Sequence, residues 1–175
     1  MTPAQHLRPG QRTDWLLEPE RYHWIFVDFL DPRLGSREVL LRYLLACLRR
    51  PASIPCDLER FLGVMSDALC TPTVILLDEI GVALQRCPEL DNAFWDGLRF
   101  LATHVEGNLA FVLAARESPV QLAHDSGQSS PFFNIFGYTV TLGPLTETEA
   151  RALLSSAPIP FSPTDVDWIL AHSER

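Results

Sequence analysis

The chain has 175 residues, 47% of them hydrophobic and 21% charged, which is enough apolar chain for one buried core and excludes disorder as the main state. The net charge of −8 argues against a nucleic-acid partner, because such a partner requires a basic face. No apolar run approaches the roughly 20 residues that span a bilayer, and residues 1–10 contain no apolar signal core, so we expect a cytoplasmic protein without a membrane partner.

The first part of the chain predicts an arm, a strand and two helices. Residues 1–21 are polar and contain three prolines, which is typical of an arm or loop. The aromatic and β-branched run 24–29 predicts a strand buried on both faces, as in a parallel sheet. Ser36 can cap a helix that reaches about Arg49, and a second helix is expected over 57–69, each with one apolar face.

The middle of the chain predicts two more buried strands. The apolar run 73–77 ends in Asp78 and Glu79, and a helix with an apolar face is expected over 91–105. The run 109–114 predicts the third strand, and Arg116 follows it closely. The next twenty residues are rich in Gly, Ser, Pro and Asn and predict a loop with a short helix near Val120.

The last part predicts a fourth strand and two helices. Residues 138–142 read Tyr-Thr-Val-Thr-Leu, a strand pattern that a Gly-Pro turn follows. Thr146 and Glu149 have the spacing of a capping box, which starts a helix, and a final helix is expected from Ser162. Strands that alternate with helices predict an α/β fold with a parallel sheet and right-handed crossovers.

The carboxylates of Asp78 and Glu79 carry the chemical argument. They follow a buried strand, and open α/β sheets bind ligands at the carboxyl ends of their strands. This is the pattern of a Walker B motif, in which Asp78 offers a hard oxygen ligand to Mg²⁺ and Glu79 polarises an attacking water. The alternative is a buried strand that happens to end in two solvated acids.

Arg116 is the second candidate site residue. It comes one helix after the acidic pair, at the position where the sensor 1 residue of a P-loop ATPase lies beside the γ-phosphate. A guanidinium group can donate hydrogen bonds to phosphate oxygens. The alternative is a surface arginine that pairs with Glu117 or with a helix C-terminus.

The order of these parts resembles the STAND branch of the AAA+ P-loop ATPases over residues 22–173. The matching passages are similar to the family's second strand, its Walker B strand, its sensor 1 strand and its entry into the helical lid, in the order 24–29, 74–79, 109–116 and 138–154. The resemblance implies a three-layer parallel sheet of the P-loop NTPase type, with the strand order 5-1-4-3-2.

The same resemblance implies a domain plan and a site. Residues 1–21 would be an arm, 22–145 an ATPase-like core and 146–175 the start of the lid. ATP and Mg²⁺ are the implied cofactors. Glu79 would be catalytic, Asp78 would hold the metal, and Arg116 would contact the nucleotide.

One part of the family pattern has no counterpart here, namely the Walker A loop GxxxxGK[ST]. All 14 basic residues are arginine, so the lysine that grips the phosphates is missing, and Gly10 is the one glycine before the first strand. The resemblance therefore implies an incomplete sheet without the Walker A strand, and a chain that is inactive unless segments of a longer parent chain complete it.

The missing strand predicts two possible arrangements of its neighbours. The strands at 109–114 and 138–142 either pair directly or leave an exposed edge that is prone to self-association. A further strand between them, supplied by residues 1–21, would contradict both.

The remaining candidates are weaker. Asp14, Asp28 and Asp31 can join a metal site, although a strand aspartate such as Asp28 more often bonds to a neighbouring turn. The four cysteines lack CxxC spacing and predict reduced thiols rather than a zinc site.

Two other functions stay open. The first is a non-catalytic α/β protein-interaction module derived from such an ATPase. The second is a Mg²⁺-dependent hydrolase that uses Asp28, Asp78 and Glu79.

Overall fold

The structure is a computed structural model that describes residues 18–127 and 129–173. Asp14 therefore lies outside the described residues. The chain divides into two compact units, one that ends at Phe136 and one that begins at Gly137. Each unit is described by itself below.

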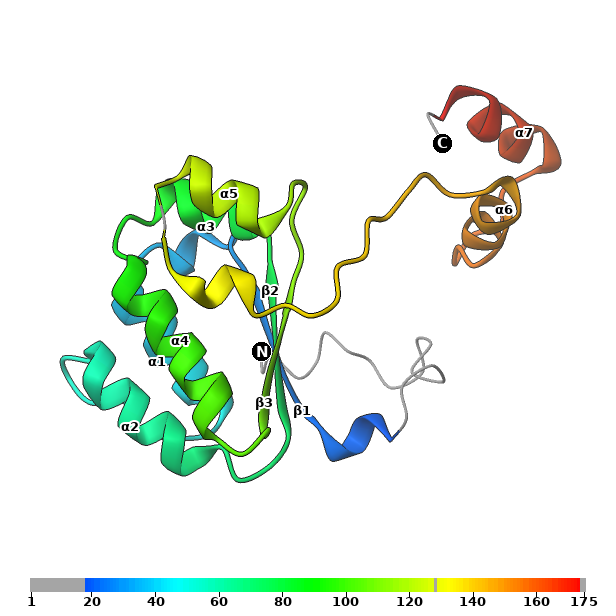
Figure 1. Cartoon of the computed structure of the whole chain (residues 1–175). Coiled ribbons are helices and arrows are strands. Elements are labelled where there is room, and N and C mark those ends of the chain that lie inside the picture. The colour runs from blue at the N-terminus through cyan, green and yellow to red at the C-terminus, as the bar shows by residue number, and fades with distance from the viewer. Residues whose placement is uncertain (1–17, 128, 174–175) are drawn as a thin grey trace. The chain divides into compact units, whose positions relative to one another are not determined.

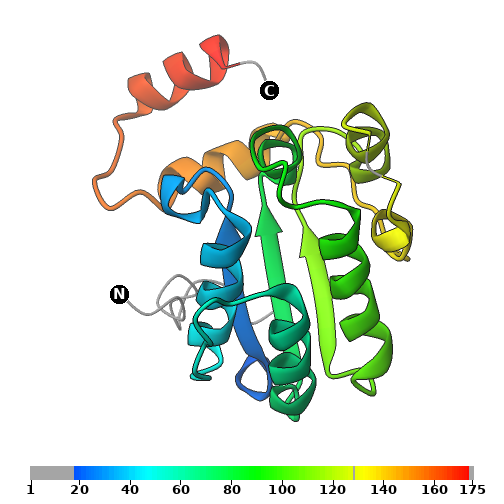
Figure 2. The same cartoon turned by 90° about the vertical axis from the view of Figure 1, so that its left-hand side faces the viewer.

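A parallel three-stranded sheet forms the centre of the first unit. Its strands are β1 (His23–Asp28), β2 (Thr73–Asp78) and β3 (Leu109–Leu113), in the order β1-β2-β3, and Figure 2 shows β2 between the other two. The register places Asp28 beside Asp78. The predicted α/β class with parallel strands is thus confirmed.

Three helices cover one face of this sheet, as Figure 1 shows with the sheet seen nearly edge-on. They are α1 (Arg37–Cys47), α2 (Leu58–Ala68) and α4 (Asn92–His104), and each begins after a polar residue whose side chain accepts a backbone N–H. The caps are Ser36, Asp57 and Asp91. The apolar stripes of these helices are buried against the sheet, where Trp95, Phe61 and Ile25 are fully enclosed.

The opposite face of the sheet has no α-helix on it in the described part of this unit (Figure 1). Ala110 is exposed there, Val112 keeps 48% of its surface exposed, and Leu76 is half-buried. The expected three-layer sheet is therefore a two-layer arrangement among these residues, and the prediction of strands buried on both faces is wrong for β3. Apolar composition alone does not require a second cover, because an edge strand can leave one face in water.

Short helices lie near the carboxyl ends of the strands. They are α3 (Ile80–Arg86) and α5 (Pro119–Asp125), followed by the 3-10 turn η5 (Pro131–Asn134). Phe132 of η5 is fully buried and stacks on Trp95, with 5.3 Å between their ring centroids. Two further 3-10 turns, η3 (Pro19–Arg21) and η4 (Pro32–Leu34), flank β1.

The predicted fourth strand is wrong, because residues 138–142 form no strand. Tyr138, Val140 and Leu142 are 97%, 79% and 90% exposed. The sheet of the described residues therefore ends at β3, which leaves an open edge. Direct pairing of 109–114 with 138–142, the first of the two expected arrangements, is therefore wrong, and residues 1–17, the expected source of any contradicting strand, lie outside the described residues.

The second unit contains the helices α6 (Glu147–Ser155) and α7 (Pro163–His172). Each starts with a capping box, formed by Thr146 with Glu149 and by Ser162 with Asp165. The hydrogen bonds from Thr146 lower the pKa of Glu149. Across the described residues of both units, no helix is long and apolar enough to cross a membrane.

Candidate functional site

Two aspartates end neighbouring strands at the carboxyl edge of the sheet. Asp28 and Asp78 are register partners at the ends of β1 and β2, so they point to the same face, the one that α1, α2 and α4 do not cover. Asp28 Oδ1 accepts the Leu30 N–H at 2.8 Å, and Asp78 Oδ1 accepts the Glu79 N–H at 2.9 Å. Each bond fixes one oxygen and leaves Oδ2 without a hydrogen bond to the described residues.

Glu79 joins β2 directly to α3 through an unusual backbone conformation. Its φ of 54° and ψ of 44° lie in the left-handed region, which costs a non-glycine residue about 1–3 kcal/mol. The amide of Ile80 then bonds to Ala114 O at 3.3 Å, which ties the start of α3 to the end of β3. A sharp strand-to-helix turn of this kind presents the side chain at its apex above the sheet edge.

The side chain of Glu79 lies beside Arg116. Glu79 Oε1 and Arg116 Nη2 are 3.6 Å apart, and the exposed fractions of the two side chains are 25% and 87%. Such an exposed pair stabilises a fold by at most about 1 kcal/mol. Arg116 is therefore held loosely enough to exchange Glu79 for another anion. The alternative partner considered for Arg116, Glu117, makes no ion pair with it among the described residues.

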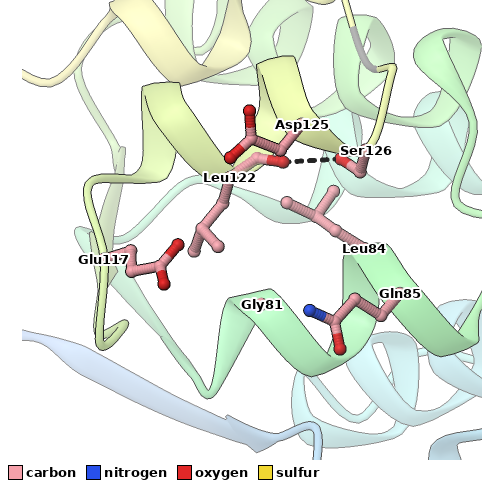
Figure 3. Close-up of a pocket in the computed structure, with 7 residues that line it drawn as sticks. All are labelled: Gly81, Leu84, Gln85, Glu117, Leu122, Asp125 and Ser126. Atoms are coloured by element: carbon pink, nitrogen blue, oxygen red, sulfur yellow. Dashed lines mark hydrogen bonds between the residues drawn. The ribbon is translucent and has the colours of Figure 1, made fainter.

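A small open hollow lies between α3 and α5, as Figure 3 shows. Leu84 and Leu122 face each other across it, while Gln85 and Glu117 line its sides (Figure 3). A Cβ atom on Gly81 would meet the Leu122 side chain at 3.4 Å, so glycine lets the two helices approach. Neither Asp78 nor Glu79 lines this hollow, and the sequence predicted neither the hollow nor α3.

The weaker metal candidate Asp31 is already engaged. Its carboxylate caps η4 by accepting the Arg33 N–H and also pairs with the Arg33 guanidinium. These hydrogen bonds lower the pKa of Asp31 to about 2. Asp31 is thus anionic at neutral pH, but its oxygens are committed to Arg33 rather than turned to Asp28.

The residues present fit a hydrated cation better than a nucleotide. The unpaired oxygens of Asp28 and Asp78 suit Mg²⁺, which binds through one or two carboxylates and keeps several waters. No group of three or more His, Cys, Asp or Glu side chains in the described ranges can hold a metal by itself. A triphosphate does not fit these residues alone, because the chain has no lysine for its phosphates.

No protein-family model matches the chain, and a search of curated proteins finds no match. The resemblance to AAA+ and STAND ATPases therefore stays a prediction from the residues.

Proposed function

We propose that the first unit is the Mg²⁺-binding part of an ATPase core of the AAA+ or STAND kind. This core acts only when another segment supplies the loop that holds the phosphates of the nucleotide. One observation carries the proposal. The strand end bearing Asp78 and Glu79 lies against Arg116 at the carboxyl edge of a parallel sheet, where such sheets bind ligands.

Each residue has a distinct part in this proposal. Asp78, with Asp28 beside it, would hold the cation through the Oδ2 atoms, which accept no hydrogen bond from the described residues. Arg116 would leave Glu79 for the phosphate oxygens, because an exposed ion pair is weak and a phosphate accepts two parallel N–H bonds. Glu79, once released, would orient a water for attack. Bound Mg²⁺ would supply positive charge for the phosphates.

The strained backbone of Glu79 supports the same proposal. Left-handed non-glycine residues cluster at functional sites, because their cost persists only where the surroundings impose it. The left-handed conformation of Glu79 turns the chain from β2 into α3 and fixes where the Glu79 side chain leaves the backbone.

The 175-residue chain gives the first test. With Mg²⁺, we expect no ATP hydrolysis above that of buffer and weak or absent ATP binding by isothermal titration calorimetry, because no lysine is present. Micromolar ATP affinity would contradict the requirement for a further segment.

The decisive test uses a longer chain. The gene is sequenced upstream of the codon for Met1, and any in-frame segment with GxxxxGK[ST] is included in the expressed protein. We expect this protein to bind and hydrolyse ATP, Glu79→Gln to bind without hydrolysis, and Asp78→Asn to lose the Mg²⁺ dependence of binding. Arg99→Gln, on an exposed part of α4, is the matched control and should leave both properties unchanged.

A non-catalytic interaction module is the second candidate. It is favoured by the missing lysine together with the open edge of β3. An upstream sequence without a phosphate loop, or a longer chain that binds no nucleotide, would select this candidate over the ATPase core.

A further inference from the structure

The outer edge of β3 carries backbone groups that have no hydrogen-bond partner in the described part of the chain. Thr73 N–H bonds to Asn108 O at 2.8 Å, so residue 108 and every second residue after it turn their N–H and C=O towards β2. The residues between them turn theirs to the open side, where no hydrogen bond in the described part of the chain meets them: Leu109, Phe111 and Leu113.

This edge lacks the features that usually prevent strand pairing. Natural edge strands are protected by lysines, prolines, inward charges or bulges. β3 reads Leu-Ala-Phe-Val-Leu, with no charge and no proline, and both strands of the β2–β3 ladder are in continuous register. The edge is therefore a straight apolar template for another strand.

We propose that β3 is a dimer interface, in which β3 pairs antiparallel with β3 of a second copy of this chain around a two-fold axis at Phe111. The result is one continuous six-stranded sheet, to which each protomer contributes three strands. A two-fold axis forces the antiparallel direction, since the same strand meets itself. The inference applies to the 175-residue chain and requires no nucleotide.

The register around Phe111 is selected by the backbone. With the axis there, Leu109 lies opposite the partner's Leu113, and Phe111 lies opposite the partner's Phe111. These are the residues whose N–H and C=O groups point outwards, so all of them find partners in the pair. A shift of the register by one residue would place the outward N–H and C=O groups opposite residues whose own N–H and C=O groups already face β2, so the hydrogen bonds could not form.

Charge complementarity supports the same register. Counting outwards from Phe111, Glu106 and Arg116 are each five positions away on opposite sides. Glu106 lies in the turn before β3 and Arg116 follows its end, so antiparallel pairing places the acidic end of one strand at the basic end of the other, and both side chains are exposed. Opposite charges at the ends of an apolar strand favour antiparallel pairing, whereas a parallel pair would bring like charges together.

Two matched variants test this register. Ala110 lies opposite the partner's Val112 in a non-hydrogen-bonded pair, with Cα atoms about 4.5 Å apart. Both side chains are exposed on the sheet face that α1, α2 and α4 leave open, so the protomer tolerates charge there. The variant with Ala110→Lys and Val112→Lys sets lysine against lysine, and the variant with Ala110→Lys and Val112→Glu sets lysine against glutamate.

Light scattering during size-exclusion chromatography measures the outcome. We expect the wild type to have twice the chain mass of 19.7 kDa. The Lys/Lys variant should be monomeric, with at least about a tenfold weaker dimer, and the Lys/Glu variant should dimerise as the wild type does. Circular dichroism confirms that both variants are folded. A wild type that stays monomeric, or a Lys/Glu variant that dissociates as Lys/Lys does, overturns the proposal.

Hydrogen exchange identifies the occupant of the edge. In the dimer, the amides of Leu109, Phe111 and Leu113 should exchange faster on dilution, because dissociation uncovers them. Protection of these amides in a monomer would show that a segment of the same chain covers the edge, which also overturns the proposal. In a longer protein an added strand would exclude the dimer, so the 175-residue chain is the form to test.

Discussion

Replacement of Glu79 by glycine should stabilise the protein even though it removes a charged site residue. The left-handed conformation costs an L-residue about 1–2 kcal/mol that glycine does not incur. Against this gain stand the loss of the exposed pair with Arg116, at about 0.5 kcal/mol, and the greater freedom of glycine in the unfolded chain, at roughly 0.5 kcal/mol. The net expectation for Glu79→Gly is a gain of about 0.5 kcal/mol.

Arg49→Gly is the matched control for this substitution. Arg49 has a φ of 55° after the last turn of α1, where its N–H bonds to Ala46 O and the next amide bonds to Leu45 O. This is the position that glycine favours in helix C-caps. Arg49 makes no ion pair in the described residues, so Arg49→Gly should gain about 1 kcal/mol, more than Glu79→Gly.

Urea unfolding followed by circular dichroism measures both effects. A change of 1 kcal/mol moves the midpoint by about 0.5 M at typical slopes. Glu79→Gln keeps the strain and should lie within about 0.5 kcal/mol of the wild type. If Glu79→Gly lowers stability while Arg49→Gly raises it, the Glu79 side chain is a structural support and the strain argument is wrong. If neither raises stability, the backbone reasoning fails at both positions.

Four further predictions concern the first unit. Gly63→Ala should raise the free energy of unfolding in urea by up to about 1 kcal/mol, because a Cβ there meets nothing within 4 Å. Gly97→Leu should lower the free energy of unfolding by about 1–3 kcal/mol, because a Cβ at this position already meets the Leu62 side chain of α2 at 3.3 Å. Burial raises the pKa of Tyr43 to about 12, so stability should fall as pH rises from about 10 to 12, a loss that Tyr43→Phe lacks in urea titrations at each pH. Cys70 is the exposed cysteine, and mass spectrometry after brief iodoacetamide treatment should find it modified at least about tenfold faster than the buried Cys56 and Cys87. Equal labelling of these three thiols would contradict their positions in the structure.

The sheet and its main helices were predictable because their signals are local. The runs at 24–29, 73–77 and 109–114 are apolar and bounded by turn residues, and they match β1, β2 and β3 within a residue or two. The helix starts at Ser36 and Thr146 were equally clear, since a short polar side chain satisfies amides that no helix can satisfy internally.

The failures arise where tertiary context decides. Residues 138–142 have strand-forming side chains, but a strand exists only where it pairs with another strand, and these residues pair with none of the described strands. α3 was missed because Glu79 is no recognisable cap and because Gly81 looks like a helix breaker. In the structure, the lack of a side chain at Gly81 lets Leu122 of α5 pack closely against α3.

The candidate site was predictable in position but not in detail. Because parallel strands end at one edge, the strand order sufficed to place Asp78, Glu79 and Arg116 near one another. The left-handed backbone of Glu79 and the ion pair between Asp31 and Arg33 depend on local geometry that residue types do not specify. What the site binds stays a prediction.

The stretch around Tyr138 separates the two compact units, and its side chains are almost entirely in water. Proteases cut most readily where the backbone is accessible and unpaired. Chymotrypsin, which cleaves after aromatic residues, should therefore nick the native chain at Tyr138 before it reaches the enclosed aromatic residues such as Trp95. A single early cut at this place would yield both units as separate fragments and would open each to study by itself.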